Sequence, residues 1–253
     1  GGPSRGAAAG SQGRHSFVRK VRGQGSGFRG DTAHSGEVAV VVLAAGGSSR
    51  LGTPKQLVRF RGRTLLRRAV ETALAGAVLP SPRAARATAA PVVSRVVVVL
   101  GARAAALRAE LDGLPVHIAV NRRWREGLAS SLRAGLRAAL AATGRARPAA
   151  GLFLTCDQPY VTPSLLRRLV RRFRRGAPIV ACAYDGTLGV PALFARGYFS
   201  DLLDLSGDQG AKQILARHRA EVAPVCFARG AADIDQPRDV LRLRNPPSAR
   251  MPT

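Results

Sequence analysis

Short, almost wholly apolar runs recur along this chain, and stretches with helical periodicity separate them. The runs that predict strands are residues 38–43, 94–100, 116–120, 151–155, 178–183 and 221–227. The stretches that predict helices are residues 64–78, 102–111, 130–142, 163–175, 199–205, 209–218 and 237–243. Strands that are apolar throughout are typical of a parallel sheet covered on both faces. The alternation therefore predicts an α/β fold with a doubly wound, mostly parallel sheet and helices on both faces.

The first apolar run ends in a loop of small residues. The chain continues there as Ala44-Ala45-Gly46-Gly47-Ser48-Ser49, with Arg50 and Lys55 close behind. Glycine tolerates positive φ, and amides free of regular pairing can point at phosphate oxygens. Ligands of such sheets bind beyond the carboxyl ends of the strands, where this loop begins. The loop predicts a nucleotide site with Arg50 and Lys55 neutralising phosphate; the alternative is a strand-to-loop turn with incidental basic residues.

Two better-known glycine-rich motifs do not describe this loop. A Walker A loop needs Gly-Lys-Ser/Thr, whereas Thr53-Pro54 separates Gly52 from Lys55. A dinucleotide fingerprint needs Gly-x-Gly-x-x-Gly, and residues 46–52 lack that spacing.

Two aspartates follow apolar strands in similar Asp-Gln-Pro turns. Asp157 comes after the strand at 151–155, and Asp235 comes after the strand at 221–227. Magnesium in nucleotide sites takes one or two carboxylates together with substrate phosphates. The pair therefore predicts a Mg²⁺ site across the cleft from the loop. The alternative is that both turns are helix N-caps, a position where Asp is common.

Two further polar segments are candidates for ligand contact. Residues 121–132 run from a polar loop into a helix capped by Ser130 or Ser131, where amides and hydroxyls suit an anion or a ribose hydroxyl. Trp124 in this loop is interpreted as a hydrophobic plug in preference to a base-stacking residue. Residues 207–212 place Asp208 as a helix cap and Lys212 toward the cleft.

The formal charge of +25 raises the possibility of an arginine-rich nucleic-acid-binding module. The basic residues are nearly all arginines, however, and are spread over every predicted helix and linker. The few aromatic residues are not interleaved with them as a stacking platform would require. We therefore interpret the charge as a compositional bias and expect no specific nucleic-acid partner.

Cysteine and histidine chemistry finds little support. The three cysteines, at 156, 182 and 226, are too far apart for a disulfide framework or a zinc site, and Cys182 and Cys226 are expected to be buried. His117 is expected at a strand face or sheet edge. No serine elbow accompanies the histidines, so a Ser-His-Asp site is not expected.

The composition predicts one domain at residues 37–244, a disordered leader at 1–36 and a disordered tail at 245–253. The leader lacks the apolar segment of a secretory signal, and no run approaches the roughly 20 apolar residues that span a bilayer. A cytoplasmic protein without a membrane partner is expected.

Taken together, these segments resemble the MobA-like nucleotidyltransferases, and most of all the branch of molybdenum cofactor cytidylyltransferases. The blocks that carry the resemblance, in order, are residues 43–57, 127–132, 156–159, 207–211 and 233–237. The chain departs from the pattern at residues 189–191, where Val190 stands in place of a histidine or another polar residue.

The resemblance implies a Mg²⁺-dependent nucleotidyltransferase that moves CMP from CTP to a phosphorylated acceptor, molybdopterin or a similar pterin, and releases pyrophosphate. Arg50, Lys55 and Asp157 would be catalytic, and Asp157 and Asp235 would hold the metal. The nucleotide would be bound by Leu43, Ala44, Ala45, Gly46, Gly47 and Ser131. A molybdoenzyme or its chaperone would be the protein partner.

Other activities stay open on the sequence alone. A member of the same family could use another nucleoside triphosphate or another acceptor. Some relatives are oxidoreductase-like, so a nicotinamide- or flavin-linked reductase on this scaffold is the rival from another class.

Overall fold

The computed structural model describes residues 34–48, 51–79, 92–93, 95–141 and 147–244. The expected leader, apart from residues 34–36, and the expected tail lie outside the described residues. Within the described part of the chain, no helix has both the length and the apolar character needed to cross a membrane.

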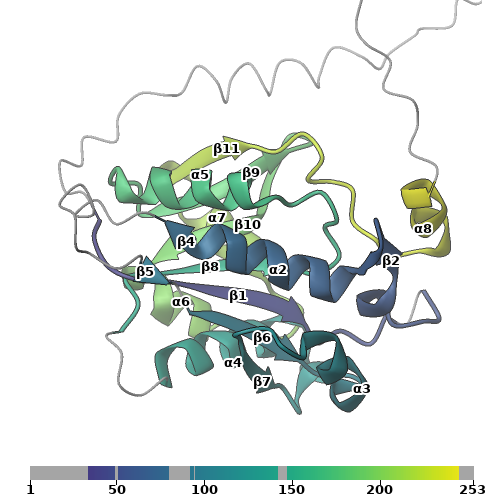
Figure 1. Ribbon diagram of the computed structural model, residues 1–253. Coiled ribbons are helices and arrows are strands. Elements are labelled where there is room, and N and C mark those ends of the chain that lie inside the picture. The colour runs from purple at the N-terminus through teal and green to yellow at the C-terminus, as the bar shows by residue number, and fades with distance from the viewer. Residues whose placement is uncertain (1–33, 49–50, 80–91, 94, 142–146, 245–253) are drawn as a thin grey trace, which may run out of the picture.

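A seven-stranded sheet forms the centre of the molecule (Figure 1). Its order is β11-β9-β10-β8-β1-β6-β7. The strands, in chain order, are β1 (Val38–Ala44), β6 (Val96–Leu100), β7 (His117–Val120), β8 (Ala150–Thr155), β9 (Ile179–Tyr184), β10 (Thr187–Ala195) and β11 (Val222–Cys226). Only β10 runs antiparallel to its neighbours, β8 and β9. The predicted α/β fold with a mostly parallel sheet is therefore confirmed.

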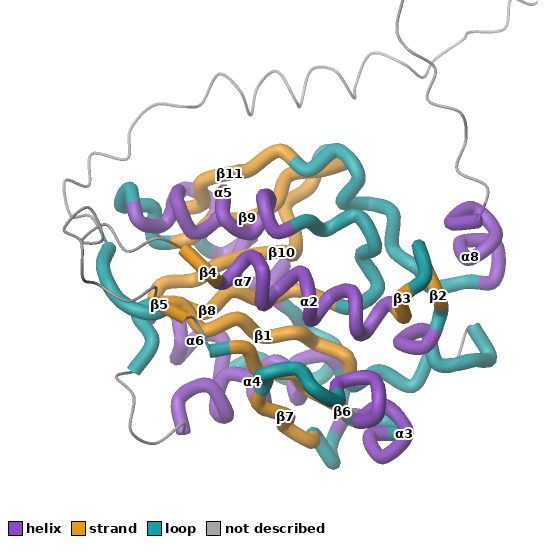
Figure 2. The backbone as a smooth tube through the Cα atoms, viewed as in Figure 1, coloured by secondary structure: helices purple, strands orange, loops and turns teal. Residues whose placement is uncertain are grey.

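Helices cover both faces of this sheet (Figure 2). On one face lie α2 (Leu65–Ala77) and α5 (Pro163–Arg174); on the other lie α4 (Leu128–Ala141), α6 (Phe199–Leu203) and α7 (Ala211–Arg217). The central strand β1 serves both layers, because Val40 and Val42 pack in one core and Val41 and Leu43 in the other. This double burial explains why β1 is apolar at every position.

Smaller elements connect these strands and helices. The helices are α3 (Ala104–Arg108), α8 (Pro237–Arg244) and five 3₁₀ turns: η1 (Lys55–Leu57), η2 (Ala109–Leu111), η3 (Trp124–Glu126), η4 (Arg196–Tyr198) and η5 (Arg219–Glu221). Two short hairpins complete the described residues, β2 (Arg59–Phe60) with β3 (Arg63–Thr64), and β4 (Val78–Leu79) with β5 (Val92–Val93). Phe60 and Leu65 pack with Ile234 and Leu243, which joins the C-terminal helix α8 to the β2–β3 hairpin.

The strand β10 was not predicted from the sequence. It contains Gly189 and Pro191, and its pairing with β9 shifts register between Gly189 and Ala192. Proline cannot donate to a ladder, and a bulge breaks the period of two that marks a strand. The residue pattern at 187–195 therefore does not indicate a strand, and the pairing with β8 and β9 is what stabilises it.

The expected N-cap residues are confirmed at two helices and are wrong at two. The hydroxyls of Thr64 and Thr162 cap the helices α2 and α5, as expected. The expectation that Ser130 or Ser131 caps α4 is wrong, because the helix already begins at Leu128 and the backbone N–H of Ala129 donates to a loop carbonyl.

Two other expectations are corrected. Asp208 does not cap α7, which begins after Gly210; the backbone N–H of Gly210 donates to the side chain of Gln213 instead. Cys182 is buried as expected, but Cys226 is exposed because it ends the edge strand β11. His117 is exposed on the other edge strand, β7, in agreement with the prediction.

His218 lies between two carboxylates, away from the cavity described below. Its Nε2 is 2.8 Å from Oδ2 of Asp201, and its Nδ1 is 2.9 Å from Oε1 of Glu221. The hydroxyl of Tyr198 donates to Glu221, and a nitrogen of Arg217 is 3.8 Å from Asp201. Hydrogen bonds to Asp201 and Glu221 raise the pKa of His218 above its ordinary value of 6.5.

We expect Gly135→Ala to lower the free energy of unfolding by about 1–2 kcal/mol. A Cβ at this position would lie 2.4 Å from Cγ1 of Val41 and 2.8 Å from Cγ2 of Val99. Overpacking costs about 1–3 kcal/mol and outweighs the roughly 0.5–1 kcal/mol that alanine gains in a helix. Urea denaturation measures the change. Gly197→Ala is the control, because nothing lies within 4 Å of its Cβ; equal losses in both variants would contradict this account of the α4–sheet contact.

We expect the stability difference between wild type and His218→Gln to be largest between pH 4.5 and 6.5. The raised pKa of His218 means that its stabilisation is complete below 6.5 and is lost as pH rises through the folded-state value. The lowered pKa of Glu221, held down by Tyr198 and His218, means that its stabilisation is lost only on acidification. Urea titrations from about pH 5 to about pH 9 test this. His117→Gln is the control, and a gap that narrows equally in both variants contradicts the assignment.

Candidate functional site

A cavity of about 590 Å³ opens at the carboxyl ends of β1 and β8. It is lined by Leu43, Ala44, Ala45, Gly46, Gly47, Lys55, Gln56, Trp124, Arg125, Gly127, Leu128, Ser131, Thr155, Cys156, Asp157 and Asp208. Every residue predicted to bind the nucleotide is in this set, together with Lys55 and Asp157. The parallel arrangement of β1 and β8 is what brings the small-residue loop beside the aspartate.

The other predicted residues are not among those that line the cavity as described. Arg50 lies outside the described residues. Asp235 lies just beyond the lining and reaches it through Lys55, as described below. Lys212 is exposed on α7 and is not part of the cavity wall.

The loop after β1 is held by the buried side chain of Gln56. Its Nε2 donates to the carbonyl oxygens of Ala44 at 3.0 Å and Gly46 at 2.8 Å. Ser48 completes the network, since its hydroxyl donates to Oε1 of Gln56 and accepts from the backbone N–H of Lys55. Gln56 thus fixes the curvature of the loop and the start of the η1 turn together. Sequence reasoning missed this residue, because nothing local marks a glutamine beside Lys55 as buried.

Close packing fixes the opposite side of the loop. A Cβ at Gly101, which follows β6, would lie 2.6 Å from the carbonyl oxygen of Ala45, and the backbone N–H of Ala102 donates to that oxygen. A Cβ at Gly47 would lie 3.0 Å from the Trp124 ring. The ring is half-buried against the core on the α4 side and also lines the cavity, so it plugs the wall and presents a surface to the cavity.

Arg125 lies over this ring. Its guanidinium carbon is 4.4 Å from the ring centroid of Trp124. Arg125 therefore adds a positive charge to the cavity wall, and the sequence analysis did not single it out.

The α4 side of the cavity depends on Asn121. Its buried amide donates to the hydroxyl oxygens of Ser130 at 2.8 Å and Ser131 at 3.0 Å. The hydroxyl of Ser130 can donate to the carbonyls of Arg123 and Gly127. Because Ser131 accepts from Asn121, its own O–H can donate into the cavity.

The loop at residues 207–208 closes the same wall. The backbone N–H of Ala129 donates to the carbonyl of Gly207 at 3.1 Å. Gly127 has φ +97°, and a Cβ there would lie 2.3 Å from that same oxygen. Glycine is required at position 127 for both reasons, and this contact brings Asp208 to the cavity.

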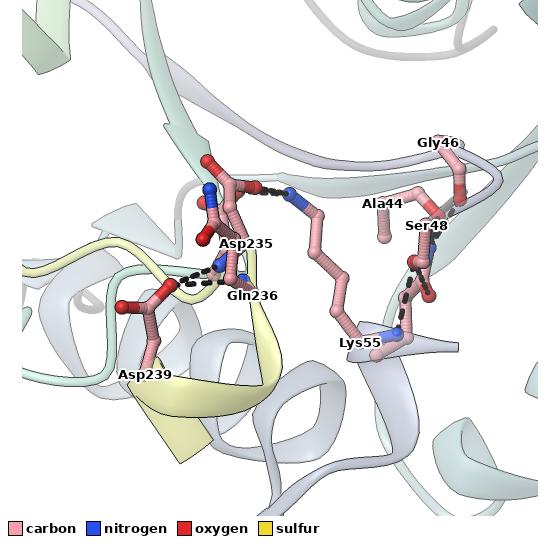
Figure 3. Close-up of polar contacts among 9 residues, drawn as sticks. Ala44, Gly46, Ser48, Lys55, Asp235, Gln236 and Asp239 are labelled. Atoms are coloured by element: carbon pink, nitrogen blue, oxygen red, sulfur yellow. Dashed lines mark hydrogen bonds and ion pairs between the residues drawn. The ribbon is translucent and has the colours of Figure 1, made fainter. Parts of the chain in front are cut away.

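The side chain of Lys55 joins the two predicted metal-binding aspartates, and Figure 3 shows it pointing toward one of them, Asp235. Its Nζ is 2.5 Å from Oδ2 of Asp157 and 2.9 Å from Oδ1 of Asp235. Burial alone would lower the pKa of Lys55, but the two carboxylates outweigh burial and raise that pKa above its ordinary value. The three groups therefore form a charged cluster at the cavity's edge.

Backbone contacts hold the two aspartates in this position. The N–H of Ile234 donates to the carbonyl of Asp157 at 3.1 Å, which ties the segment before α8 to the end of β8. The carboxylate of Asp239 accepts from the backbone N–H groups of Asp235 and Gln236. The alternative, that the aspartates serve as helix N-caps, does not describe Asp157, because Thr162 caps the following helix α5; at α8 it is Asp239 whose carboxylate accepts the N–H groups before the helix.

The donor set fits a hard divalent cation. Oxygens of Asp157 and Asp235 converge on one positively charged atom, and carboxylate oxygens are the ligands that Mg²⁺ and Mn²⁺ prefer. Within the described ranges no group of three or more His, Cys, Asp or Glu side chains gathers at one point. A cation held here would take its remaining ligands from substrate and water, as magnesium does in nucleotide sites.

Cys156 is buried beside this cluster and is not activated. Burial, with the adjacent charge of Asp157, raises the pKa of the Cys156 thiol to about 12. A thiol with such a pKa is not a nucleophile near neutrality.

The sequence was compared with protein families and curated proteins. Residues 40–222 match the family described as MobA-like NTP transferase domain. The chain is 34% identical over 189 residues to nicotine blue oxidoreductase of Paenarthrobacter nicotinovorans, covering 70% of this chain and 81% of that protein.

The fold was compared with solved structures. Rv0371c of Mycobacterium tuberculosis H37Rv is similar, with a TM-score of 0.66 and 29% identity over 84% of this chain and 98% of that one. A structure of Rv0371c in complex with manganese has a TM-score of 0.63 and 27% identity, covering 82% of this chain and 97% of that one.

We expect Gln56→Leu to weaken binding of a nucleoside triphosphate about tenfold and to lower the free energy of unfolding by about 1–3 kcal/mol. The change removes the donor of both loop carbonyls while filling a similar volume. Titration calorimetry with CTP and urea denaturation measure the two effects. Gln213→Leu is the control, since it also removes a side-chain hydrogen bond to the backbone, at Gly210, and Gln213 does not line the cavity. Unchanged affinity in Gln56→Leu would show that the loop does not depend on Gln56 for binding.

Proposed function

Because this chain belongs to the MobA-like NTP transferase family, we propose that it transfers CMP from CTP to a phosphorylated acceptor and releases pyrophosphate. Molybdopterin is the acceptor that we propose, and the reaction is that of a molybdenum cofactor cytidylyltransferase. The observation that carries the proposal is the convergence of the small-residue loop, Lys55 and the two aspartates at one cavity.

The loop after β1 and Lys55 would bind the triphosphate. The space in front of Gly46 is open, because a Cβ there would meet nothing within 4 Å, so a phosphate could come close to the loop backbone. The ammonium of Lys55 lines the same cavity and would stabilise charge on the departing pyrophosphate. Arg50, which follows this loop in the sequence, is proposed to share that role.

The α4 side of the cavity would bind the nucleoside. The hydroxyl of Ser131 is held by Asn121 and can donate to a ribose or base oxygen. The pair Ala44-Ala45 at the start of the loop supports CTP over GTP, by resemblance to the cytidylyltransferase branch. The acceptor is less constrained, since Val190 offers no polar side chain where relatives have one.

Asp157 and Asp235 would hold Mg²⁺. The ion would supply positive charge next to the α-phosphate. A manganese complex of Rv0371c, at 27% identity, supports a divalent cation in this fold. The phosphate of the acceptor forms a bond to the α-phosphorus of CTP as the bond to the β-phosphate breaks. The attacking group is already an anion, so no general base is required, and none of the residues that line the cavity is a histidine.

A second candidate is a reductase activity, favoured by the 34% identity to nicotine blue oxidoreductase. The small-residue loop could receive the pyrophosphate of a nicotinamide or flavin cofactor. This function predicts a bound redox cofactor and no pyrophosphate release.

We expect Asp157→Asn to lower kcat for pyrophosphate release from CTP and molybdopterin at least about 100-fold, because the change removes negative charge from the proposed metal site and keeps the side-chain shape. A coupled pyrophosphate assay measures the rate. Asp112→Asn, in an exposed turn after η2, is the control and should keep wild-type activity.

The same assay separates the alternatives. Screening CTP, GTP, ATP and UTP with several phosphorylated acceptors tests the base and the acceptor. Full activity in Asp157→Asn would contradict the metal site. No pyrophosphate from any triphosphate, together with oxidation of NADH or of a reduced flavin, would establish the reductase instead.

A further inference from the structure

Lys55 lies at the boundary between two parts of the site. Its ammonium contacts the carboxylates of Asp157 and Asp235, and the same side chain lines the cavity proposed for the triphosphate. The exposed fractions of the side chains are 19% for Lys55 and 14% for Asp157, so the Lys55–Asp157 ion pair is largely buried. One cation thus stands where two different sets of anionic oxygens would compete for it.

The surroundings of Lys55 are fixed, whereas its side chain can move. The backbone N–H of Lys55 donates to the hydroxyl of Ser48 (Figure 3), and the next residue, Gln56, is bonded to the carbonyl of Ala44 in the loop. On the other side, Asp157 and the segment before α8 are joined through backbone hydrogen bonds. The lysine stem has four rotatable carbons between these two rigid parts. A change of partner therefore needs only a rotation of this side chain.

We propose that Lys55 is a tethered competitor of the divalent cation. In the protein without nucleotide its ammonium offsets one of the two negative charges of Asp157 and Asp235, occupies their oxygens and disfavours the metal. When a triphosphate enters the cavity, the ammonium transfers to the phosphate oxygens and the carboxylates become free for the metal. The inference rests on the proposed function, because it takes the two aspartates as metal ligands and the loop as the triphosphate site.

Electrostatics favour this exchange. The ammonium is 2.5 Å and 2.9 Å from the two carboxylate oxygens, and a divalent cation on the same oxygens would be repelled by a charge so close. The same exchange makes binding reciprocal: nucleotide raises the affinity for metal, and metal raises the affinity for nucleotide by the same factor. Metal and nucleotide then bind cooperatively, and the site has a low affinity for metal alone.

The test measures Mn²⁺ binding without turnover. Free Mn²⁺ is followed by electron paramagnetic resonance during titration of the full chain, with and without α,β-methylene-CTP. We expect Lys55→Met to bind Mn²⁺ about tenfold more tightly than wild type when no nucleotide is present, within the range typical of coupling between sites. The nucleotide analogue should raise the Mn²⁺ affinity of wild type at least about fivefold and that of Lys55→Met much less.

Controls separate this effect from a general change in charge or folding. Lys212→Met removes the same charge from an exposed position on α7 and should leave Mn²⁺ affinity unchanged. Lys55→Gln keeps a hydrogen-bond donor for the carboxylates and removes the charge, and it should behave like Lys55→Met. Circular dichroism melts with and without Mn²⁺ should show a larger gain in Tm for both Lys55 variants than for wild type.

The outcomes distinguish this inference from the proposed function. If Asp157→Asn loses Mn²⁺ binding, but both Lys55 variants bind Mn²⁺ no more tightly than wild type, the competition is overturned and the metal site stands. Absence of Mn²⁺ binding in every variant, with or without nucleotide, overturns both. Tighter binding in the Lys55 variants supports the competition even if CTP and molybdopterin give no pyrophosphate, in which case the proposed reaction alone fails.

Discussion

The ion pair of Lys55 with Asp157 and Asp235 is the contact on which the site depends. It joins three segments that are remote in the sequence: the turn after the β1 loop, the end of β8 and the stretch before α8. Without the ammonium between them, the two carboxylates would repel each other, and their partial burial would increase the cost of that repulsion. The ammonium offsets the repulsion and gives the C-terminal segment a defined position on the sheet.

The sheet supplies the frame in which this contact can form. The pairing of β1 with β8 and β6 aligns their carboxyl ends, and the loops that leave these ends meet at one edge. Small residues then allow those loops to touch, since side chains at Gly101 or Gly127 would collide with backbone atoms. The cavity is therefore a consequence of strand order and of missing side chains, and the charged groups are placed around it by short turns.

The features that the sequence predicts are those with a local physical signature. Residues 38–43 are buried on both faces and are apolar throughout, so the central strand and the loop after it could be located without a structure. The pairing of Lys55 with Asp157 and Asp235 spans 102 and 180 residues, and no pattern within one segment encodes it.

The misses have related causes. Gln56 is buried only because the loop folds over it, and β10 is a strand only because β8 and β9 pair with it. In both cases distant contacts decide the structure, and the local residue pattern gives no sign of them.

The geometry also bears on the two activities suggested by the relatives. A redox cofactor bound through its pyrophosphate would need donors and positive charge at the loop, which amides and Lys55 could supply. It would gain nothing from two carboxylates that converge beside those phosphates, because like charges would repel and would have to be neutralised. In the proposed nucleotidyltransferase that pair would have a use, since a divalent cation would turn the carboxylates from a source of repulsion into part of the phosphate site. The arrangement of Asp157, Asp235 and Lys55 is thus better matched to phosphate chemistry than to hydride transfer.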